Sequence, residues 1–406
     1  MSYRLIDLEL SGPITPVPLE SGQHGFGIVA RWRGRPIGFH LEEWPAGALV
    51  GADELASIAD RHFAEAVLAA RVEDALPPSA AGDGRSGPTL SIAICTRNRA
   101  QRLARLLRSL DELRPEPSFA GVEIIVVDNG STDDTKGAVA RFAGARHVLE
   151  RKAGLNFARN RALSEAKGDL IAFLDDDVVV DAGWLAGLVS AWRSRPDAGG
   201  FSGLVLPYRL QTEAQLLFER RGGFRRGFKR IEFRAGNYHN PLFPVGAGSV
   251  GAGCNMAFDR RLLLDLGGFD EALDTGAPLP GGGDLDIFYR VLRSGRAMVY
   301  EPRYAVHHEH RETLAELQRQ YWSWGLGLMA FVAKSRRSDP ELARRHRAMV
   351  AWWLGDQARA FLRSVRRSDL RGARFTLAET WGGVMGFAGE YERSRARVAA
   401  IAAEAS

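Results

Sequence analysis

The sequence predicts an α/β protein whose central sheet is mostly parallel. From Leu90 onward, short apolar segments typical of buried strands alternate with stretches in which apolar residues recur at helical spacing. The clearest strand segments are SIAIC (91–95), IIVV (124–127) and LIAFL (170–174). Strands separated by helices in this way pair in parallel and are covered by helices. Such sheets bind ligands at the carboxyl ends of their strands, so polar residues at those ends are the first candidates for function.

Length and composition exclude several classes of protein. The chain has 406 residues, 45% of them hydrophobic and 25% charged, which is typical of a globular protein with two or three domains rather than a fibrous or largely disordered one. Cys95 and Cys254 lie far apart and outside any Cys/His ligand spacing, so we expect neither a disulfide scaffold nor a zinc or iron–sulfur site. Because the sequence shows neither a signal-peptide pattern nor an apolar run long enough to cross a bilayer, we expect a cytoplasmic protein.

Changes of pattern divide the chain into four parts. Residues 1–76 are expected to form a small accessory module with a β-hairpin and one helix. Residues 77–88 lose all periodicity and are expected to be a linker. Residues 89–311 carry the alternating strands and helices, and residues 312–406 are expected to be a helical region.

Polar residues follow three of the expected strands. Thr96 ends the first, Asp128 closes the second, and Asp175, Asp176 and Asp177 end or follow the third. Adjacent carboxylates repel each other unless a cation or many hydrogen-bond donors are present, so a divalent metal is the natural partner of the triplet. The alternative is that one aspartate caps the next helix while the others face water. Asp128 precedes a Gly/Ser/Thr/Asp turn suited to close approach by a nucleotide.

Seven motifs in order resemble the family-2 glycosyltransferases of the GT-A fold, over about residues 89–327. They are VEIIVVDNGSTDDT, GLNFARNRAL, DLIAFLDDDVVV, GAGCNMAF, LGGFDEAL, GGGDLDIFYRVLRSG and VHHEHR. The resemblance implies a Rossmann-like GT-A catalytic domain and a hexosyltransferase-type enzyme of glycan, glycoconjugate or polysaccharide biosynthesis. It also implies a nucleotide-sugar donor (by default a UDP-sugar), a divalent metal (Mn²⁺ or Mg²⁺) and inversion at the sugar carbon. The acceptor would be a hydroxyl on a glycan, a lipid-linked compound or another molecule.

The resemblance assigns residues to the donor side of the site. Asp128 matches the aspartate that hydrogen-bonds the donor base, with Thr96 in support, although Thr96 can equally cap its strand. Arg159 and Asn160 match a donor-side pair in which the guanidinium meets the base or the diphosphate. A surface ion pair is the alternative for Arg159. Asn255 follows a glycine-rich segment and is expected to bind the sugar.

The resemblance also implies the metal ligands. Asp175 and Asp177 match the outer positions of the Asp-x-Asp (DXD) motif, and Asp176 fills the variable position. Asp177 is expected to ligate the metal directly, and Asp175 to contact the ribose or the metal and its water. His308 is the preferred further ligand, and His310 is a second candidate because alternate residues of an extended segment face the same side. A metal suits this reaction because the departing nucleoside diphosphate accumulates negative charge.

The acceptor hydroxyl needs a base, which the resemblance assigns to Asp284. In the family a glutamate precedes this aspartate, but here that position is Gly283, which puts the strength of the activity or the acceptor geometry in doubt. Asp286 is an alternative base, or it caps the helix that follows.

Two further regions combine cationic and aromatic residues. The segment 219–234, with Arg225 and Arg226, is expected to be either a flexible lid over the diphosphate or a phosphorylated acceptor, or a solvated basic loop. Residues 311–406 carry 17 Lys and Arg against 10 Asp and Glu. Their helices are expected either to cap the catalytic domain or to contact the inner face of an anionic membrane peripherally. No nucleic-acid-binding module is recognisable, so nucleic acid is not an expected partner.

Two rival functions stay open. A nucleotidyltransferase can use a related sheet and aspartate pair, but the late positions of Asp284 and His308 argue against it. A degenerate GT-A-fold protein that binds a nucleotide or a glycan without transferring sugar is supported only by Gly283. Retention of the other motif residues favours an active glycosyltransferase.

Overall fold

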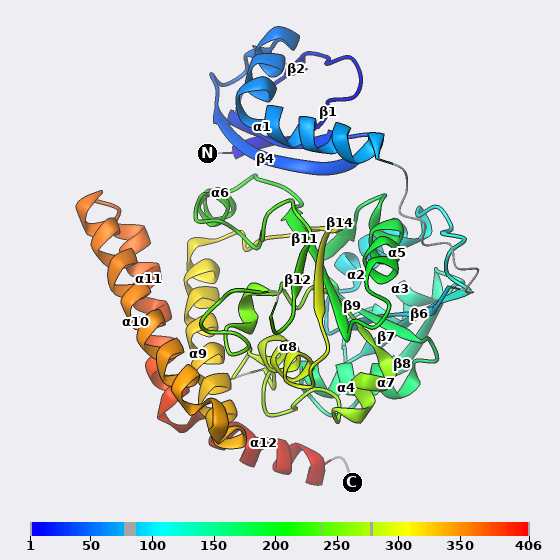
Figure 1. Ribbon diagram of the computed structural model, residues 1–406, viewed down its shortest axis with the longest axis vertical. Helices are drawn as coiled ribbons and strands as arrows, with labels where there is room; N and C mark the ends of the chain where they lie inside the picture. The colour runs from blue at the N-terminus through cyan, green and yellow to red at the C-terminus, as the bar shows by residue number, and fades with distance from the viewer. Residues whose placement is uncertain (1, 77–86, 237, 277–278, 405–406) are drawn as a thin grey trace.

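The structure is a computed structural model that describes residues 2–76, 87–236, 238–276 and 279–404. It contains an N-terminal module, a central sheet covered by helices, and a layer of long C-terminal helices along one side (Figure 1). The expected linker, residues 77–88, lies outside the described residues except for its last two positions. The α/β class, the N-terminal strand module and the helical C-terminal region are confirmed.

The N-terminal module is a three-stranded sheet covered by one helix. The sheet has the order β1-β3-β4, with β1 and β3 parallel and β3 and β4 antiparallel. The elements are β1 (Ser2–Glu9), β2 (Val17–Pro18), β3 (Gln23–Trp32), β4 (Arg35–Glu43), β5 (Leu49–Val50) and α1 (Ala52–Ala75). Phe63 of α1 packs over Gly38, where a Cβ atom would lie 2.4 Å from the ring. A residue without a side chain is therefore needed at that point of β4.

Backbone and charged contacts join this module to the central sheet. The Tyr3 amide donates to the Leu210 carbonyl at 2.7 Å. Arg31 of β3 lies 2.7 Å from the buried carboxylate of Asp181, which follows β10. Because an unpaired buried carboxylate is costly, the Arg31 contact ties the module to the region beside the aspartate triplet.

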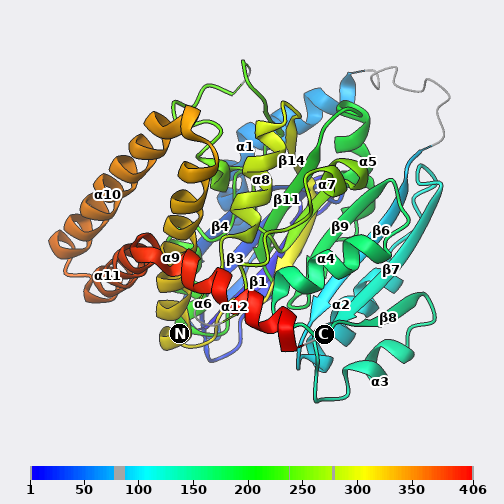
Figure 2. The same ribbon diagram turned by 90° about the horizontal axis from the view of Figure 1, so that it is seen from below.

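The central sheet has the order β10-β14-β11-β13-β9-β6-β7-β8, and β12 pairs with β14. Strands β8, β7, β6 and β9 pair in parallel, whereas β13 runs antiparallel between β9 and β11 (Figure 2). The strands are β6 (Thr89–Thr96), β7 (Gly121–Asp128), β8 (Ala145–Leu149), β9 (Leu170–Asp175), β10 (Val178–Val180), β11 (Gly200–Pro207), β12 (Ile231–Phe233), β13 (Asn255–Asp259) and β14 (Met298–His308). The sheet is thus parallel where the apolar segments predict it and mixed beyond β9.

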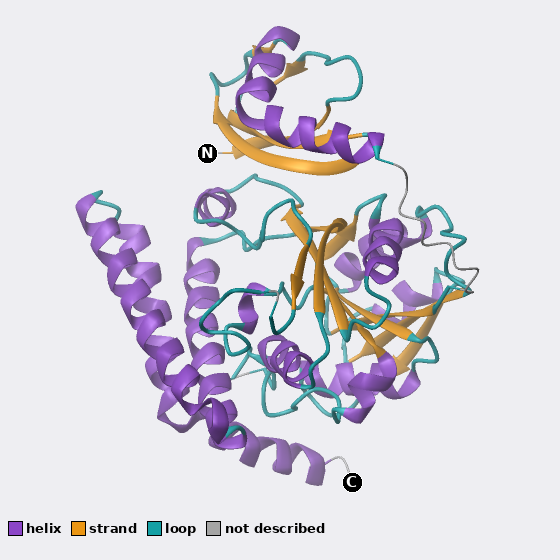
Figure 3. Cartoon of the chain, viewed as in Figure 1, coloured by secondary structure: helices purple, strands orange, loops and turns teal. Residues whose placement is uncertain are grey.

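Helices cover both faces of this sheet (Figure 3). Alternate residues of β6 face opposite sides: Ile92 and Ile94 pack with α2 and α5, whereas Ala93 packs with α4 and α8. The helices of this part are α2 (Ala100–Asp111), α3 (Thr135–Ala140), α4 (Leu155–Glu165), α5 (Trp184–Ser194), α6 (Glu213–Arg220), α7 (Arg260–Asp265) and α8 (Gly283–Arg293), with the short turn η1 (Ala247–Ser249). Burial on both faces explains why these strands read as continuous apolar runs.

Two of the C-terminal helices, α9 (Leu314–Ser338) and α11 (Leu370–Met385), cross with their backbones in direct contact. The other helices of this region are α10 (Ala343–Arg366) and α12 (Tyr391–Glu404), with η2 (Pro340–Leu342) and η3 (Gly386–Glu390) between the helices. Glycines at the α9–α11 crossing leave no room for a side chain: a Cβ atom at Gly325 would lie 1.9 Å from the Glu379 carbonyl oxygen, and one at Gly382 would lie 2.0 Å from the Trp322 carbonyl oxygen. Among the described residues, no helix is both long and apolar enough to span a bilayer. Peripheral membrane contact stays a prediction.

The glycine crossing gives a test of this packing. Alanine normally stabilises a helix interior by about 1 kcal/mol relative to glycine. We expect Gly382→Ala to lower the melting temperature by about 2–6 °C instead, because the added methyl group collides with the backbone of α9. Gly355→Ala in α10 is the matched control, since its Cβ atom meets only the end of the Arg359 side chain at 3.4 Å. Equal melting temperatures for the two variants would contradict the close crossing.

Candidate active site

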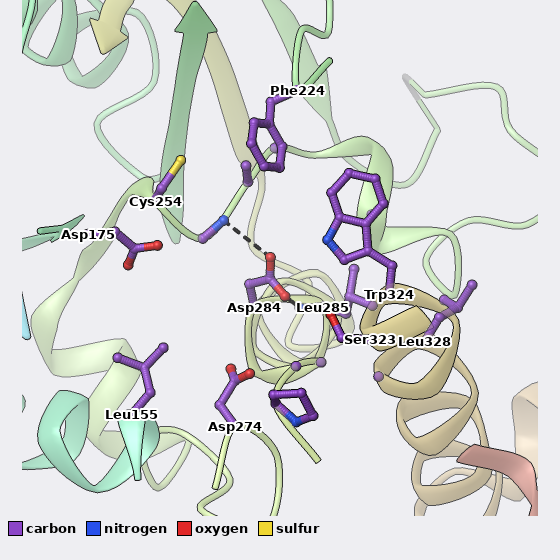
Figure 4. Close-up of a pocket in the computed structure, with 18 of the residues that line it drawn as sticks. Leu155, Asp175, Phe224, Cys254, Asp274, Asp284, Leu285, Ser323, Trp324 and Leu328 are labelled. Carbon is purple, nitrogen blue, oxygen red and sulfur yellow. Dashed lines mark hydrogen bonds between the residues drawn. The ribbon is translucent and has the colours of Figure 1, made fainter. Parts of the chain in front are cut away.

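A pocket of about 1560 Å³ lies at the carboxyl ends of the central strands. Thr96 ends β6, the aspartate triplet begins at the end of β9, and His308 ends β14. Asp284, in the first turn of α8, lies across the pocket from Asp175 (Figure 4). The fold thus brings together residues more than 200 positions apart in the sequence, at the edge of the sheet where parallel strands bind ligands.

Within the triplet, Asp176 has a supporting role. The Thr96 hydroxyl donates to Asp176 at 2.7 Å, and Arg99 donates to the other oxygen of the same carboxylate at 2.8 Å. Thr96 lines the pocket, and its hydroxyl proton is used in the bond to Asp176. Its expected role in supporting the donor base stays a prediction, and this bond also ties Thr96 to the loop that follows β9.

The side chains of Asp177 and His308 face each other in the pocket. Oδ1 of Asp177 is buried and has no hydrogen-bond partner among the described residues, and it lies 3.4 Å from Nε2 of His308. Burial lowers the pKa of His308 to about 3, so its ring is neutral. Whether Nε2 carries the proton is decided by the bonds on the other side of the ring.

Those bonds indicate that Nε2 of His308, which faces Asp177, is the unprotonated nitrogen. His310 donates from Nε2 to the buried carboxylate of Glu219 at 2.7 Å, and burial lowers the pKa of His310 to about 3. Neutral His310 then has only an acceptor at Nδ1, which lies 3.0 Å from Nδ1 of His308. His308 must donate there, so its Nε2 is unprotonated and faces the carboxylate as a second acceptor. His310 is therefore corrected from a metal-ligand candidate to the residue that orients His308.

Arg159 joins the two sides of the pocket. Its buried guanidinium lies 3.6 Å from the Asp175 carboxylate and 3.3 Å from that of Asp274. The alternative of a surface ion pair is thereby excluded. Burial raises the pKa of Asp175 to about 7 and that of Asp274 to about 6, although Arg159 opposes both shifts.

Asp274 is a site residue that the sequence analysis missed. Its backbone adopts the left-handed conformation (φ +61°), and its carboxylate accepts from the Gly283 amide at 3.2 Å. A Cβ atom at Gly283 would lie 2.4 Å from both this carboxylate and the amide nitrogen of Asn156. The Asp274 carboxyl group thus occupies the space beside Gly283, where the family resemblance implies a glutamate. The only signal in the sequence was its place shortly after the LGGFDEAL motif.

The two candidate bases have different surroundings. Asp284 lines the pocket, and one of its oxygens accepts from the Gly253 amide at 3.2 Å (Figure 4). Asp286 is buried outside the pocket lining, where it pairs with Arg290 at 2.7 Å and with Lys334. The alternative assignment of Asp286 as the base is therefore corrected, because its carboxylate anchors α8 to α9.

Two asparagines expected to bind the donor instead hold the backbone. Asn255 is fully buried behind the pocket, where it accepts from the Trp184 indole at 3.1 Å and donates to the Tyr304 carbonyl at 2.8 Å. Asn160 is bonded to both the amide and the carbonyl of Phe269. Both expectations are corrected, since neither side chain reaches the pocket.

Asp128 lies just behind the pocket wall. Its carboxylate accepts from the Ser131 amide at 2.8 Å and lies 3.1 Å from His147, a partner that the sequence analysis did not identify. The neighbouring Asn129 lines the pocket, but its side chain bonds the Glu150 and Lys152 carbonyls and the Gly154 amide. A role of Asp128 toward the donor base stays a prediction.

The two arginines expected on a lid are held in place. Arg225 pairs with Glu219 and lies 4.3 Å from the ring centre of Phe39 in the N-terminal module, so its expected contact with the substrate is corrected. Arg226 lines the pocket and donates to the Gly248 carbonyl at 3.0 Å. These contacts argue against a fully solvated loop, and the role of the segment as a lid stays a prediction.

The raised pKa of Asp274 predicts that the free energy of unfolding depends on pH. Because the folded protein holds this proton up to about pH 6, the wild type loses stability as the pH rises from about 4 to 6. Asp274→Asn has no such dependence. We expect the free energy of unfolding of the variant, relative to wild type, to increase by about 3 kcal/mol between pH 4 and pH 7 in denaturant titrations. A difference that is independent of pH would contradict the burial of this charge.

Comparisons with known proteins find similarity to glycosyltransferases. Residues 91–263 match the family model described as Glycosyl transferase family 2. The pre-mycofactocin glycosyltransferase of Mycobacterium tuberculosis is 27% identical over 314 residues, which cover 76% of this chain and 59% of that protein. The succinoglycan biosynthesis protein ExoM of Rhizobium meliloti is 29% identical over 249 residues, covering 58% of this chain and 72% of that protein.

A mannosyltransferase of Pyrobaculum calidifontis, solved in complex with GDP-Man and Mn²⁺, is 19% identical with a TM-score of 0.49, covering 84% of this chain and 97% of that one. The chain spans about three-fifths of the length of the pre-mycofactocin relative. Over residues 91–263, about two-fifths of its length, the chain is thus similar to the family 2 glycosyltransferases.

Proposed function

We propose that the protein transfers a sugar from a nucleotide-sugar donor, by default a UDP-sugar, to an acceptor hydroxyl with inversion at the sugar carbon. The observation that carries the proposal is the pair of facing acceptors, Asp177 and His308, placed across one pocket from the carboxylate of Asp284. A cation site and a general base are the two parts that this reaction requires from the protein.

The residues present fit a divalent cation. Oδ1 of Asp177 and Nε2 of His308 are both acceptors with no donor between them among the described residues, and Asp175 lies beside them in the pocket. An oxygen-rich set with one imidazole suits Mn²⁺ or Mg²⁺. A cation bound there would offset the negative charge that develops on the departing nucleoside diphosphate.

Arginines of the pocket lining suit the diphosphate. Arg97, Arg99, Arg226 and Arg311 all line it. Arg99 also donates to the triplet, so its charge is held at the carboxyl end of β9. We assign these side chains to attraction and orientation of the diphosphate.

Asp284 is assigned as the base. The Gly253 amide fixes one of its oxygens, and the first turn of α8 holds the carboxylate at the pocket wall. The hydroxyl oxygen of the acceptor attacks the sugar carbon from the face opposite the diphosphate, and its proton passes to Asp284. Arg159 and Asp274 keep the wall beside Asp284 in position. Cys254 takes no nucleophilic role, because burial raises the pKa of its thiol.

A degenerate binding protein is the second candidate, and Gly283 is the observation that favours it. The Asp274 carboxylate against the Gly283 amide weakens this candidate, because it supplies a second carboxylate where the motif lacks one.

Two substitutions separate donor binding from transfer. Asp284→Asn keeps the size of the side chain but removes the proton acceptor, so we expect thermal stabilisation by the donor to persist while transfer falls about 10²–10⁴-fold. Asp177→Ala should lose the Mn²⁺-dependent stabilisation by the donor. The measurement is a thermal-shift screen of UDP- and GDP-sugars with and without Mn²⁺, followed by a transfer assay.

Asp265→Asn, an exposed carboxylate at the end of α7, is the control and should match wild type. Transfer by Asp284→Asn at the wild-type rate would refute the assignment of the base. Mn²⁺-dependent stabilisation of Asp177→Ala would refute the assignment of the metal ligand.

A further inference from the structure

The pocket continues past Asp284 into a compartment with apolar walls, which we call the apolar compartment. Its walls come from α8, α9, α10 and the segment before η1: Leu242, Leu285, Trp324, Leu328, Met349 and Trp352. Leu285, Trp324 and Leu328 lie on the side of Asp284 that is opposite Asp175 and Cys254 (Figure 4). The proposed base therefore stands at the border between a charged half and an apolar half of one pocket.

Trp324 gives this compartment a rigid aromatic wall. Its ring centre lies 5.3 Å from that of Tyr321, 5.7 Å from Phe224 and 5.8 Å from Phe218. The residue nevertheless remains 36% exposed. An aromatic ring held by three others and still open to a pocket offers contact area to a ligand at little cost in lost side-chain motion.

Some polar residues of the pocket lie on the same elements as these walls: His239 and Asn240 before Leu242, Gln320 and Ser323 on α9, and Glu379 on α11. The Ser323 hydroxyl donates to the Gln320 carbonyl of its own helix. Burial raises the pKa of Glu379 to about 7. The six apolar side chains themselves offer a ligand no hydrogen-bond partner, so a hydroxyl group placed against them would lose free energy. The walls instead suit a group that needs no hydrogen bonds.

We propose that the apolar compartment binds an alkyl or aromatic group of the acceptor, next to the hydroxyl that undergoes transfer. The inference rests on the proposed function, because it takes Asp284 as the base. In the step, the acceptor oxygen bonds to the sugar carbon, the bond from that carbon to the diphosphate oxygen breaks, and the hydroxyl proton passes to Asp284. The acceptor is thus an amphiphilic alcohol rather than a free sugar.

A pair of glucosides that differ only in the aglycone tests this proposal. Binding of n-octyl β-D-glucoside and methyl β-D-glucoside to the full chain is measured by calorimetry, below the concentration at which the octyl compound forms micelles. We expect the octyl compound to bind at least tenfold more tightly, since each buried methylene strengthens binding about threefold to fourfold.

Two tryptophans on the C-terminal helices supply a matched pair of variants. Trp352 lines the compartment and is 50% exposed, whereas Trp381 lies on α11 outside the pocket lining and is 61% exposed. Both are largely exposed, so replacing either should leave the fold intact. Trp352→Gln should weaken octyl glucoside binding at least fivefold, and Trp381→Gln should leave it unchanged.

Each contrary outcome overturns the proposal. Equal binding of the two glucosides would identify a sugar subsite, equal loss in the two variants would identify non-specific adsorption, and absence of octyl glucoside binding would show that the compartment takes no apolar group. Mn²⁺-dependent binding of a UDP- or GDP-sugar, measured on the same samples, reports on the proposed function separately.

Discussion

One guanidinium holds the two halves of the pocket together. Arg159 extends from α4 between the carboxylates of Asp175 at the end of β9 and Asp274 before α8. Asp274 is buried, so its carboxylate would be costly without this partner, whereas Asp175 is partly exposed. The position of α4 on the sheet therefore fixes the charged half of the pocket relative to the wall that carries Asp284. Sugar transfer depends on that relative position, because the acceptor oxygen and the sugar carbon must be held close together and aligned for reaction.

Carboxylates and arginines are both concentrated at this edge of the sheet. Arg99 contacts Asp176 and Asp177, and Arg159 contacts Asp175 and Asp274, but Oδ1 of Asp177 has no hydrogen-bond partner among the described residues. Burial raises the pKa values of Asp175 and Asp274, which means that the fold gives up stability to keep these groups in place. An unpartnered carboxylate oxygen facing a neutral histidine is the arrangement that the proposed cation site requires.

Periodicity and the strand-end rule predicted the parallel strands and the cluster of Thr96, Asp175 and Asp177, because both depend on local sequence and on the geometry common to all parallel sheets. The directions of individual side chains were harder to predict. Asn255 matches a motif position, yet it faces the Trp184 indole behind the pocket. Asp274 was missed because its role depends on a left-handed backbone and on contact with Arg159, 115 residues away. Such contacts arise only when distant elements pack together.

The central claim is that the chain binds a nucleoside diphosphate and a divalent cation together at the end of β9. Titration of Mn²⁺ into the wild-type chain, followed by the electron paramagnetic resonance signal of the free ion, measures this coupling most directly when it is repeated with UDP and with GDP. We expect one Mn²⁺ per chain, bound at least fivefold more tightly in the presence of one of the two nucleotides, with a reciprocal gain in nucleotide affinity. Mn²⁺ binding that neither nucleotide changes would contradict the account.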